Sequence, residues 1–178
     1  MIRLLAMLVA MAQPAATPTC LPAYWGGILA GLTNRSVVEK IYGRGIYLPD
    51  EGGVPATYYR DNASTVTVHV EYGTDELVER IEIMSGNAIP RALAADPHAV
   101  SGSLRAPFVF GAWGAISLGA SLADVRSNMG VPQEEQKSPN DRVTLVYKST
   151  CSCELPAGIS FTFRAQHLVK VSYWQDLG

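Results

Sequence analysis

One stretch occurs twice in this sequence, and its later copy reads Trp113-Gly-Ala-Ile-Ser-Leu-Gly-Ala-Ser-Leu-Ala-Asp-Val-Arg-Ser-Asn-Met129. The earlier copy reads Trp25-Gly-Gly-Ile-Leu-Ala-Gly-Leu-Thr-Asn-Arg-Ser-Val-Val-Glu-Lys-Ile41 and lies about 88 residues before it. Trp, Gly, Ile, Gly, Ser or Thr, Val and Ile or Met recur in the same order without a gap. Self-similarity of this kind indicates a repeated structural unit.

Each copy has the features of a short helix with defined ends. Thr33 and Ser121 are predicted N-caps, because a hydroxyl there can accept a hydrogen bond from an orphan backbone N–H two or three residues on. Gly43 and Gly130 are predicted to end the helices. The apolar residues at helical spacing are Val37, Val38 and Ile41 in the first copy and Leu122, Val125 and Met129 in the second.

After each predicted helix, apolar and polar residues alternate, which is typical of half-buried strands. Tyr147 falls at the position of Tyr59 when the copies are aligned. The segments Leu48–Pro55 and Gln133–Asp141 are rich in turn-forming or polar residues and are predicted loops. The predicted strands cover residues 56–60, 65–71 and 77–84 in the first copy, and 143–148, 159–163 and 168–174 in the second.

We therefore predict an α+β fold of two tandem repeats, each a helix or helical hairpin packed on a three- to four-stranded antiparallel sheet. The first repeat would span residues 21–84, a linker residues 85–107, and the second repeat residues 108–178. A helix with one apolar stripe covers one face of such a sheet. The other face, which we call the open face, is expected to contact water.

The N-terminal residues 1–16 are predicted to be a signal peptide. Arg3 supplies a positive charge, residues 4–9 form an apolar core too short to cross a bilayer, and Ala10-Met-Ala12 is a small-x-small cleavage site. The mature protein is therefore expected to be periplasmic or secreted, without a membrane span. A net charge of −2 and the lack of a Lys/Arg cluster argue against nucleic-acid binding.

Export makes disulfide formation the first expectation for the cysteines, which are Cys20, Cys151 and Cys153. Cys20 could pair with either of the other two, which would join the start of the first repeat to the second. A Cys151–Cys153 bridge is the alternative, although one intervening residue would strain it. Lipidation of Cys20 is a third possibility that the sequence leaves open.

The duplicated motif resembles the module of the beta-lactamase inhibitory protein family, in which two modules stand in tandem. It is also similar to the single module of the BamE-like (SmpA/OmlA) outer-membrane lipoproteins. The resemblance covers roughly residues 21–178, and it implies a binding module outside the cytoplasm without catalytic activity. The residues that carry it are Trp25, Ile28, Gly31, Thr33, Val37 and Gly43, then Trp113, Ile116, Gly119, Ser121, Val125 and Gly130.

Alternation also assigns side chains to the open face, if the other face buries residues such as Val68 and Phe161. Mixed Tyr, Trp and Arg side chains are enriched at the energetic centres of protein interfaces. We therefore predict that these side chains bind a protein partner, as an inhibitor, an immunity-type protein or an envelope assembly accessory would. The predicted partner-binding residues are Tyr58, Arg60, His69, Arg80, Glu82, Arg164, Lys170 and Trp174.

Two other functions are weaker alternatives. The first is binding of a small molecule, a lipid or a peptidoglycan fragment in a groove between the repeats, near residues 108–113. The second is a hydrolase that uses His69 with a carboxylate, which would require Glu82 and a nucleophile in the same cleft. Cys151, Cys153 and His167 lack a fourth ligand at a recognisable spacing, so no metal, cofactor or catalytic set is expected.

Overall fold

The computed structural model describes residues 24–49, 54–61, 66–73, 75–86, 108–109, 115–148 and 157–175. The predicted signal peptide, the three cysteines, Trp113 and all but the first two residues of the predicted linker lie outside the described residues. The first half contains β1 (Tyr24–Trp25), β2 (Ile28–Leu29), α1 (Arg35–Tyr42), β3 (Ile46–Pro49), β4 (Pro55–Asp61), β5 (Val66–Tyr72) and β6 (Val78–Ser85). The second contains β7 (Phe108–Val109), β8 (Ala115–Ile116), α2 (Leu122–Met129), β9 (Glu134–Ser138), β10 (Arg142–Lys148), β11 (Ala157–Arg164) and β12 (His167–Gln175).

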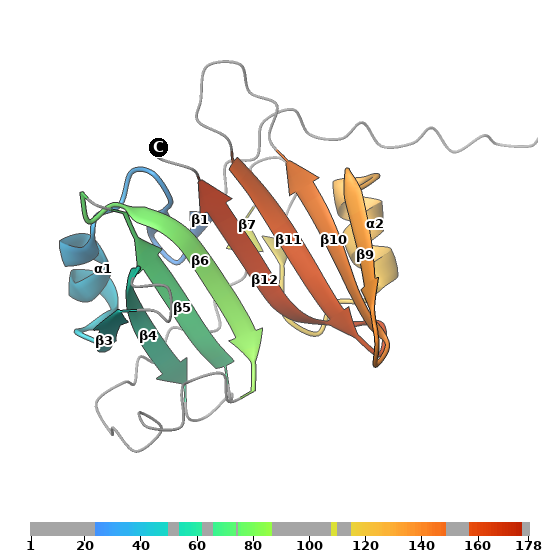
Figure 1. Ribbon diagram of the computed structural model, residues 1–178, viewed down its shortest axis with the longest axis horizontal. Helices are drawn as coiled ribbons and strands as arrows, with labels where there is room; N and C mark the ends of the chain where they lie inside the picture. The colour runs from blue at the N-terminus through green and yellow to red at the C-terminus, as the bar shows by residue number, and fades with distance from the viewer. Residues whose placement is uncertain are drawn as a thin grey trace, which may run out of the picture.

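The predicted fold class is wrong, because the strands form one continuous antiparallel sheet and not two separate helix-on-sheet units. The eight strands run in the order β3-β4-β5-β6-β12-β11-β10-β9, and the described residues include two eight-residue helices beside them (Figure 1). The halves join where β6 pairs with β12, from Met84 opposite Lys170 to Arg80 opposite Trp174. Pairing satisfies the backbone groups that each edge strand would otherwise expose. Alternation of apolar and polar residues identifies strands but does not show which strands pair, so the sequence could not reveal the pairing of β6 with β12.

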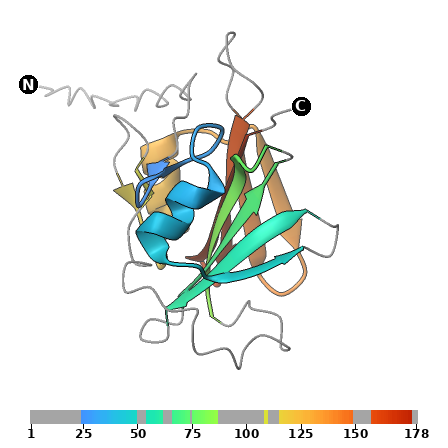
Figure 2. The ribbon, with the colours of Figure 1, turned by 90° about the vertical axis from the view of Figure 1, so that its left-hand side faces the viewer.

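The larger of two hydrophobic clusters among the described residues lies between the sheet and the helices, and a small second one joins Ile46, Ala56 and Tyr58. Both helices cover the same face of the sheet (Figures 1 and 2). Val38 of α1 and Val125 of α2 belong to the same buried cluster as sheet residues such as Val70 and Phe161. The short strands β2-β1-β7-β8 form a second small sheet, and Trp25 from β1 stacks on Tyr42 of α1 with ring centroids 5.2 Å apart. Neither of the two helices, α1 and α2, lies on the opposite, open face of the large sheet.

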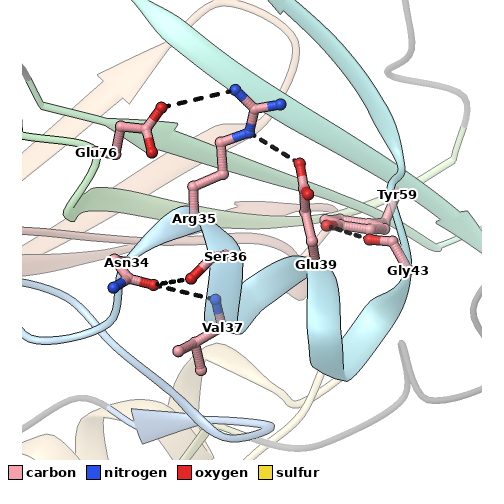
Figure 3. Close-up of polar contacts among 8 residues, drawn as sticks. All are labelled: Asn34, Arg35, Ser36, Val37, Glu39, Gly43, Tyr59 and Glu76. Atoms are coloured by element: carbon pink, nitrogen blue, oxygen red, sulfur yellow. Dashed lines mark hydrogen bonds and ion pairs between the residues drawn. The ribbon is translucent and has the colours of Figure 1, made fainter.

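The first helix begins one residue later than predicted. Its N-cap is Asn34, whose Oδ1 accepts hydrogen bonds from the Val37 N–H (3.1 Å) and the Ser36 hydroxyl (2.8 Å) (Figure 3). Thr33 instead accepts a bond from the Leu29 N–H at 2.9 Å. The second helix is capped by Ser121 as predicted, with a full capping box formed by Asp124.

This offset means that the two copies do not align without a gap. Gly31 and Gly119 make equivalent backbone bonds, to the Val78 and Leu168 carbonyls, but one extra residue separates Gly31 from its helix. The buried side of α1 is consequently Val38 and Tyr42, whereas two residues of its predicted stripe are largely exposed, Val37 at 40% and Ile41 at 41%. In α2, Val125 and Met129 are buried as predicted.

Further contacts fix the ends of the helices. The Tyr59 hydroxyl of β4 donates to the Gly43 carbonyl at 3.0 Å (Figure 3), and the Tyr147 hydroxyl of β10 donates to the Gly130 carbonyl at 3.2 Å. The predicted equivalence of the two tyrosines is thus confirmed. Burial raises the pKa of Tyr147 to about 12, so its hydroxyl keeps its proton and remains a donor.

The first turn of α1 is tied to the sheet by charge. Arg35 forms an ion pair with Glu39 at 2.9 Å and a longer one of 4.0 Å with Glu76, which precedes β6 (Figure 3). Its guanidinium carbon also lies 3.6 Å from the centre of the Tyr47 ring in β3. These contacts hold β3 at the edge of the sheet on the side of the first helix.

Two predicted loops contain strands. Leu48 belongs to β3 and Pro55 to β4, while most of Gln133–Asp141 is the strand β9. All five residues of β9 are exposed, so no apolar alternation marked it in the sequence. The hairpins that follow use backbone angles with positive φ, at Asn140 and Asp141 between β9 and β10, and at Ala165 and Gln166 between β11 and β12. Ala165 and Gln166 are the two residues between the paired Arg164 and His167, and positive φ at both is the geometry of a tight type I′ hairpin turn. The β9–β10 connection is longer, with residues 139–141 between the paired Ser138 and Arg142.

A candidate binding surface on the open face

The open face is built of side-chain rows that run across the sheet, set by the strand register. The His69 row is Tyr58–His69–Glu82–Ser172–Ser160–Val146. The Trp174 row on one side of it is Ala56–Glu71–Arg80–Trp174–Gly158–Lys148. The Lys170 row on the other side is Arg60–Thr67–Met84–Lys170–Thr162–Thr144. The predicted partner-binding residues thus share one face, and Arg164 follows beyond Thr162 on β11.

His69 lies at the centre of a buried ion network. Its Nδ1 atom is 3.6 Å from Glu71 Oε1 and 3.5 Å from Glu82 Oε2. Its ring stacks on Tyr58, with centroids 4.3 Å apart and planes 14° apart. His69 is only 5% exposed and Tyr58 8%, so both rings support the face from within it. Whether either touches a partner stays a prediction.

Glu82 connects this network to the second half of the chain. Its Oε1 atom accepts from Lys170 Nζ of β12 at 2.6 Å. Burial alone would raise the pKa of the carboxyl, but the hydrogen bonds from His69 and Lys170 and their positive charges outweigh it and lower the pKa of Glu82 to about 2. The carboxylate therefore stays charged at every physiological pH and holds β6 and β12 together at their joint.

Arg80 and Trp174 are direct neighbours in the next row. Glu71, whose side chain is 9% exposed, holds Arg80 Nη1 at 3.1 Å, yet 45% of the Arg80 side chain remains accessible. On the other side, the Trp174 ring covers Gly158, where an added Cβ would meet the ring at 2.3 Å. Glycine lets the indole approach this closely, because a larger residue would meet three of its ring carbons within 3 Å. The open face therefore presents the Arg80 guanidinium beside the Trp174 indole. Glu71 contacts the guanidinium, and the indole packs on Gly158.

The remaining predicted residues have different surroundings. Arg60 is partly buried, and its Nε atom has no hydrogen-bond partner within the described ranges. Lys170 keeps about a third of its side chain exposed, and Arg164 is exposed. Glu71 was not among the predicted residues, although it shares the parity of His69 in the same strand. The alternation of β5 could have identified it.

The hydrolase alternative required His69, Glu82 and a nucleophile in one cleft. His69 and Glu82 do converge, and both Glu71 and Glu82 approach the Nδ1 atom of the ring. The other nitrogen, Nε2, is buried and lacks a hydrogen-bond partner among the described residues. A general base must reach the proton that it removes. In the part of the chain that the structure describes, no group of three His, Cys, Asp or Glu side chains is placed to hold a metal ion.

Comparison with known proteins supplies a fold relationship. No protein-family model and no curated protein matches the sequence. The structure is similar to that of a DUF4309 family protein (YjgB) from Bacillus subtilis subsp. subtilis str. 168, with a TM-score of 0.52, 14% identity, and coverage of 84% of this chain and 83% of that one. This likeness indicates a shared fold.

A second solved structure is an extracellular protein containing a SCP domain from Bacillus anthracis str. Ames, with a TM-score of 0.46 and 12% identity. The match covers 81% of this chain and 43% of that one. Within the described ranges, the chain has no helix that is long and apolar enough to cross a membrane.

Proposed function

We propose that this chain is an exported protein-binding module that holds its partner through the middle of the open face. The observation that carries the proposal is the adjacent pair Arg80 and Trp174, at the joint between the two halves of the sheet. Arg and Trp are the side chains most often found at the energetic centres of protein interfaces. Here they stand side by side, both partly exposed, on the face opposite α1 and α2.

The neighbours of this pair reduce the cost of binding. Glu71 restrains the Arg80 guanidinium by an ion pair, and the Trp174 indole packs on Gly158. Both side chains therefore have a defined position in the unbound protein. Ordering a mobile side chain at an interface costs about 0.5–1.5 kcal/mol, and a side chain that is already restrained avoids much of that loss. The surface is thus suited to a partner that offers a carboxylate to Arg80 and an apolar group to Trp174.

The place of action rests on the N-terminal sequence. Residues 1–16 have the charge, apolar core and small residues of a signal peptide, so we place the mature protein in the periplasm or outside the cell. An inhibitor, an immunity-type protein or an envelope assembly accessory all fit that location. The modules that the duplicated motif resembles support the same class of function.

Affinity capture with paired variants tests this proposal. The chain carrying Arg80→Ala and Trp174→Ala is compared with wild type and with a control carrying Arg44→Ala and Tyr47→Ala. The control removes an exposed arginine and a half-exposed aromatic ring away from the open face. Baits are incubated with envelope and extracellular fractions of the source cell under oxidising conditions, after circular dichroism has shown that each is folded. We expect the open-face variant to lose partners that the control retains, and equal capture by both would refute the proposed surface.

A further inference from the structure

A polar pocket lies on the open face, beside the Lys170 row and away from Trp174. It encloses about 440 Å³ and is bordered by the ends of five neighbouring strands, from β6 across β12, β11 and β10 to β9. Ligand pockets commonly have volumes of roughly 300–1,000 Å³, so this one is large enough for a small molecule. The described lining residues are Met84, Ser85, Ser138, Arg142, Thr144, Thr162, Arg164, Val169 and Lys170.

The lining is strongly biased in charge. Arg142, Arg164 and Lys170 are cationic, and no carboxylate is among the described residues that line the pocket. Lys170 is already neutralised by Glu82, at 2.6 Å. Neither Arg142 nor Arg164 forms an ion pair with any described residue. Among the described residues, the two guanidinium groups of the pocket therefore have no compensating carboxylate.

The placement of these two arginines opposes a rule of sheet stability. Arg142 on β10 is directly opposite Arg164 on β11. Like charges in directly opposed positions destabilise an antiparallel pair, by an amount within the range of roughly 0.2–1 kcal/mol that cross-strand pairs contribute. Local departures of this kind are expected at functional sites, where a ligand compensates for the repulsion.

Hydroxyl groups complete the polar lining. Thr144 and Thr162, the next pair on the same face of these two strands, have their hydroxyls 3.2 Å apart. Each hydroxyl can donate one hydrogen bond and accept others, so a ligand hydroxyl could join this pair. Ser138 adds another hydroxyl beside Arg142, with which it is paired in the sheet.

We infer that this pocket binds a small hydroxylated ligand that carries a phosphate or a carboxylate group. The anion lies between Arg142 and Arg164, whose guanidinium groups match the geometry of both oxyanions, and the ligand hydroxyls face Thr144 and Thr162. The volume exceeds that of a bare anion and suits a sugar phosphate or a sugar acid. This site goes beyond the proposed protein binding and does not depend on it.

Titration with defined probes, followed by NMR of the ¹⁵N-labelled chain, tests the inference. The probes are inorganic phosphate, glucose 1-phosphate, glucuronate and uncharged glucose. We expect saturable shifts of the backbone amides of Ser138, Thr144 and Thr162 with glucose 1-phosphate or glucuronate, and weaker binding of inorganic phosphate. Whichever of the two sugar anions binds more tightly identifies the preferred anion.

Matched variants separate a site from general charge attraction. Arg142→Gln with Arg164→Gln should weaken binding of the tighter sugar anion by roughly tenfold or more, since charge-assisted hydrogen bonds are lost. Arg44→Gln removes one positive charge, against two in the pocket variant, at an exposed residue that does not line the pocket, and it should bind as wild type does. The inference is overturned if no probe saturates, if glucose binds as tightly as the anions, or if Arg44→Gln weakens binding as much as the pocket variant. Because Trp174 does not line the pocket, capture of a protein partner and binding of the anion can fail separately.

Discussion

Replacing Glu82 by Gln should remove a large part of the acid sensitivity of this fold. Glu82 has a pKa lowered from 4.5 to about 2 in the folded chain, because His69 and Lys170 favour its charged form. A carboxylate with a depressed folded pKa stabilises the fold above its unfolded pKa and loses that contribution as the pH falls toward its folded pKa. The stabilisation is therefore complete above about pH 5 and is lost between about pH 5 and pH 2.

The size of the effect follows from the two pKa values. A difference of about 2.5 units corresponds to roughly 3.4 kcal/mol over the full titration. By pH 3 the wild-type chain should have lost about 2 kcal/mol of this, since titration in the folded state is still incomplete. Glu82→Gln keeps the shape of the side chain but cannot titrate, so its unfolding free energy should change by about 2 kcal/mol less than that of wild type between pH 7 and pH 3.

Urea unfolding at pH 7, 5, 4 and 3, monitored by tryptophan fluorescence, measures this difference. The control is Glu134→Gln, which removes a solvent-exposed carboxylate 3.9 Å from Lys148. Exposed ion pairs contribute little, so the control should keep the pH profile of wild type. If Glu82→Gln loses as much stability between pH 7 and pH 3 as wild type does, the network does not hold Glu82 in its charged form and the reasoning fails.

Three further outcomes can be checked by thermal or urea unfolding. Replacing Ala165 and Gln166 together by Asn and Gly should stabilise the chain by about 1 kcal/mol, because these residues tolerate the positive φ of this turn at lower cost; unchanged stability would contradict the strained turn. Tyr147→Phe should destabilise by about 1 kcal/mol through loss of the hydrogen bond at the end of α2, and a neutral result would mean that the bond contributes nothing net. Gly158→Ala should cost about 1–3 kcal/mol and shift the fluorescence of Trp174, because the added methyl displaces the indole; an unchanged emission spectrum would show that the ring does not lie there.

Sequence patterns predicted the parts of the fold that depend on neighbouring residues. The Ser121 cap, the buried stripe of α2 and the central strands follow from local chemistry and from alternation, and the structure contains them. The pairing of β6 with β12 depends on which edges meet in space, and nothing local encodes that. The predicted cap at Thr33 rests on its hydroxyl, but in the structure that hydroxyl accepts from the Leu29 N–H and the next residue, Asn34, caps the helix.

The candidate surface shows the same division. Parity correctly collected His69, Arg80 and Glu82 on one face, because side-chain direction alternates strictly along a strand. Alternation along a strand shows which face a side chain is on but not how exposed it is, so the burial of Tyr58 and His69 could not be predicted from it. Arg142 was not singled out, because its significance arises only from its position opposite Arg164 in the next strand.

Comparison of the two halves explains why one part of the open face holds the ion network around His69 and another part holds the pocket beside Thr162. The register places Tyr59, Val68 and Ile83 in one row and Tyr147, Ile159 and Tyr173 in the corresponding row of the other half. The neighbouring residues on the open face then correspond in pairs: His69 with Ser160, Glu71 with Thr162, and Glu82 with Ser172.

Three ionisable side chains of the first half thus correspond to small hydroxyls in the second, whereas Arg80 corresponds to Lys170, which is also charged. In the first half, the ionisable side chains form a buried ion network that connects β6 with β12. The second half leaves the corresponding space open beside Thr162 and lines it with arginines. On the covered face the duplicated residues remained apolar, because one core serves both helices. The differences between the copies are therefore informative mainly on the open face, where both proposed binding sites lie.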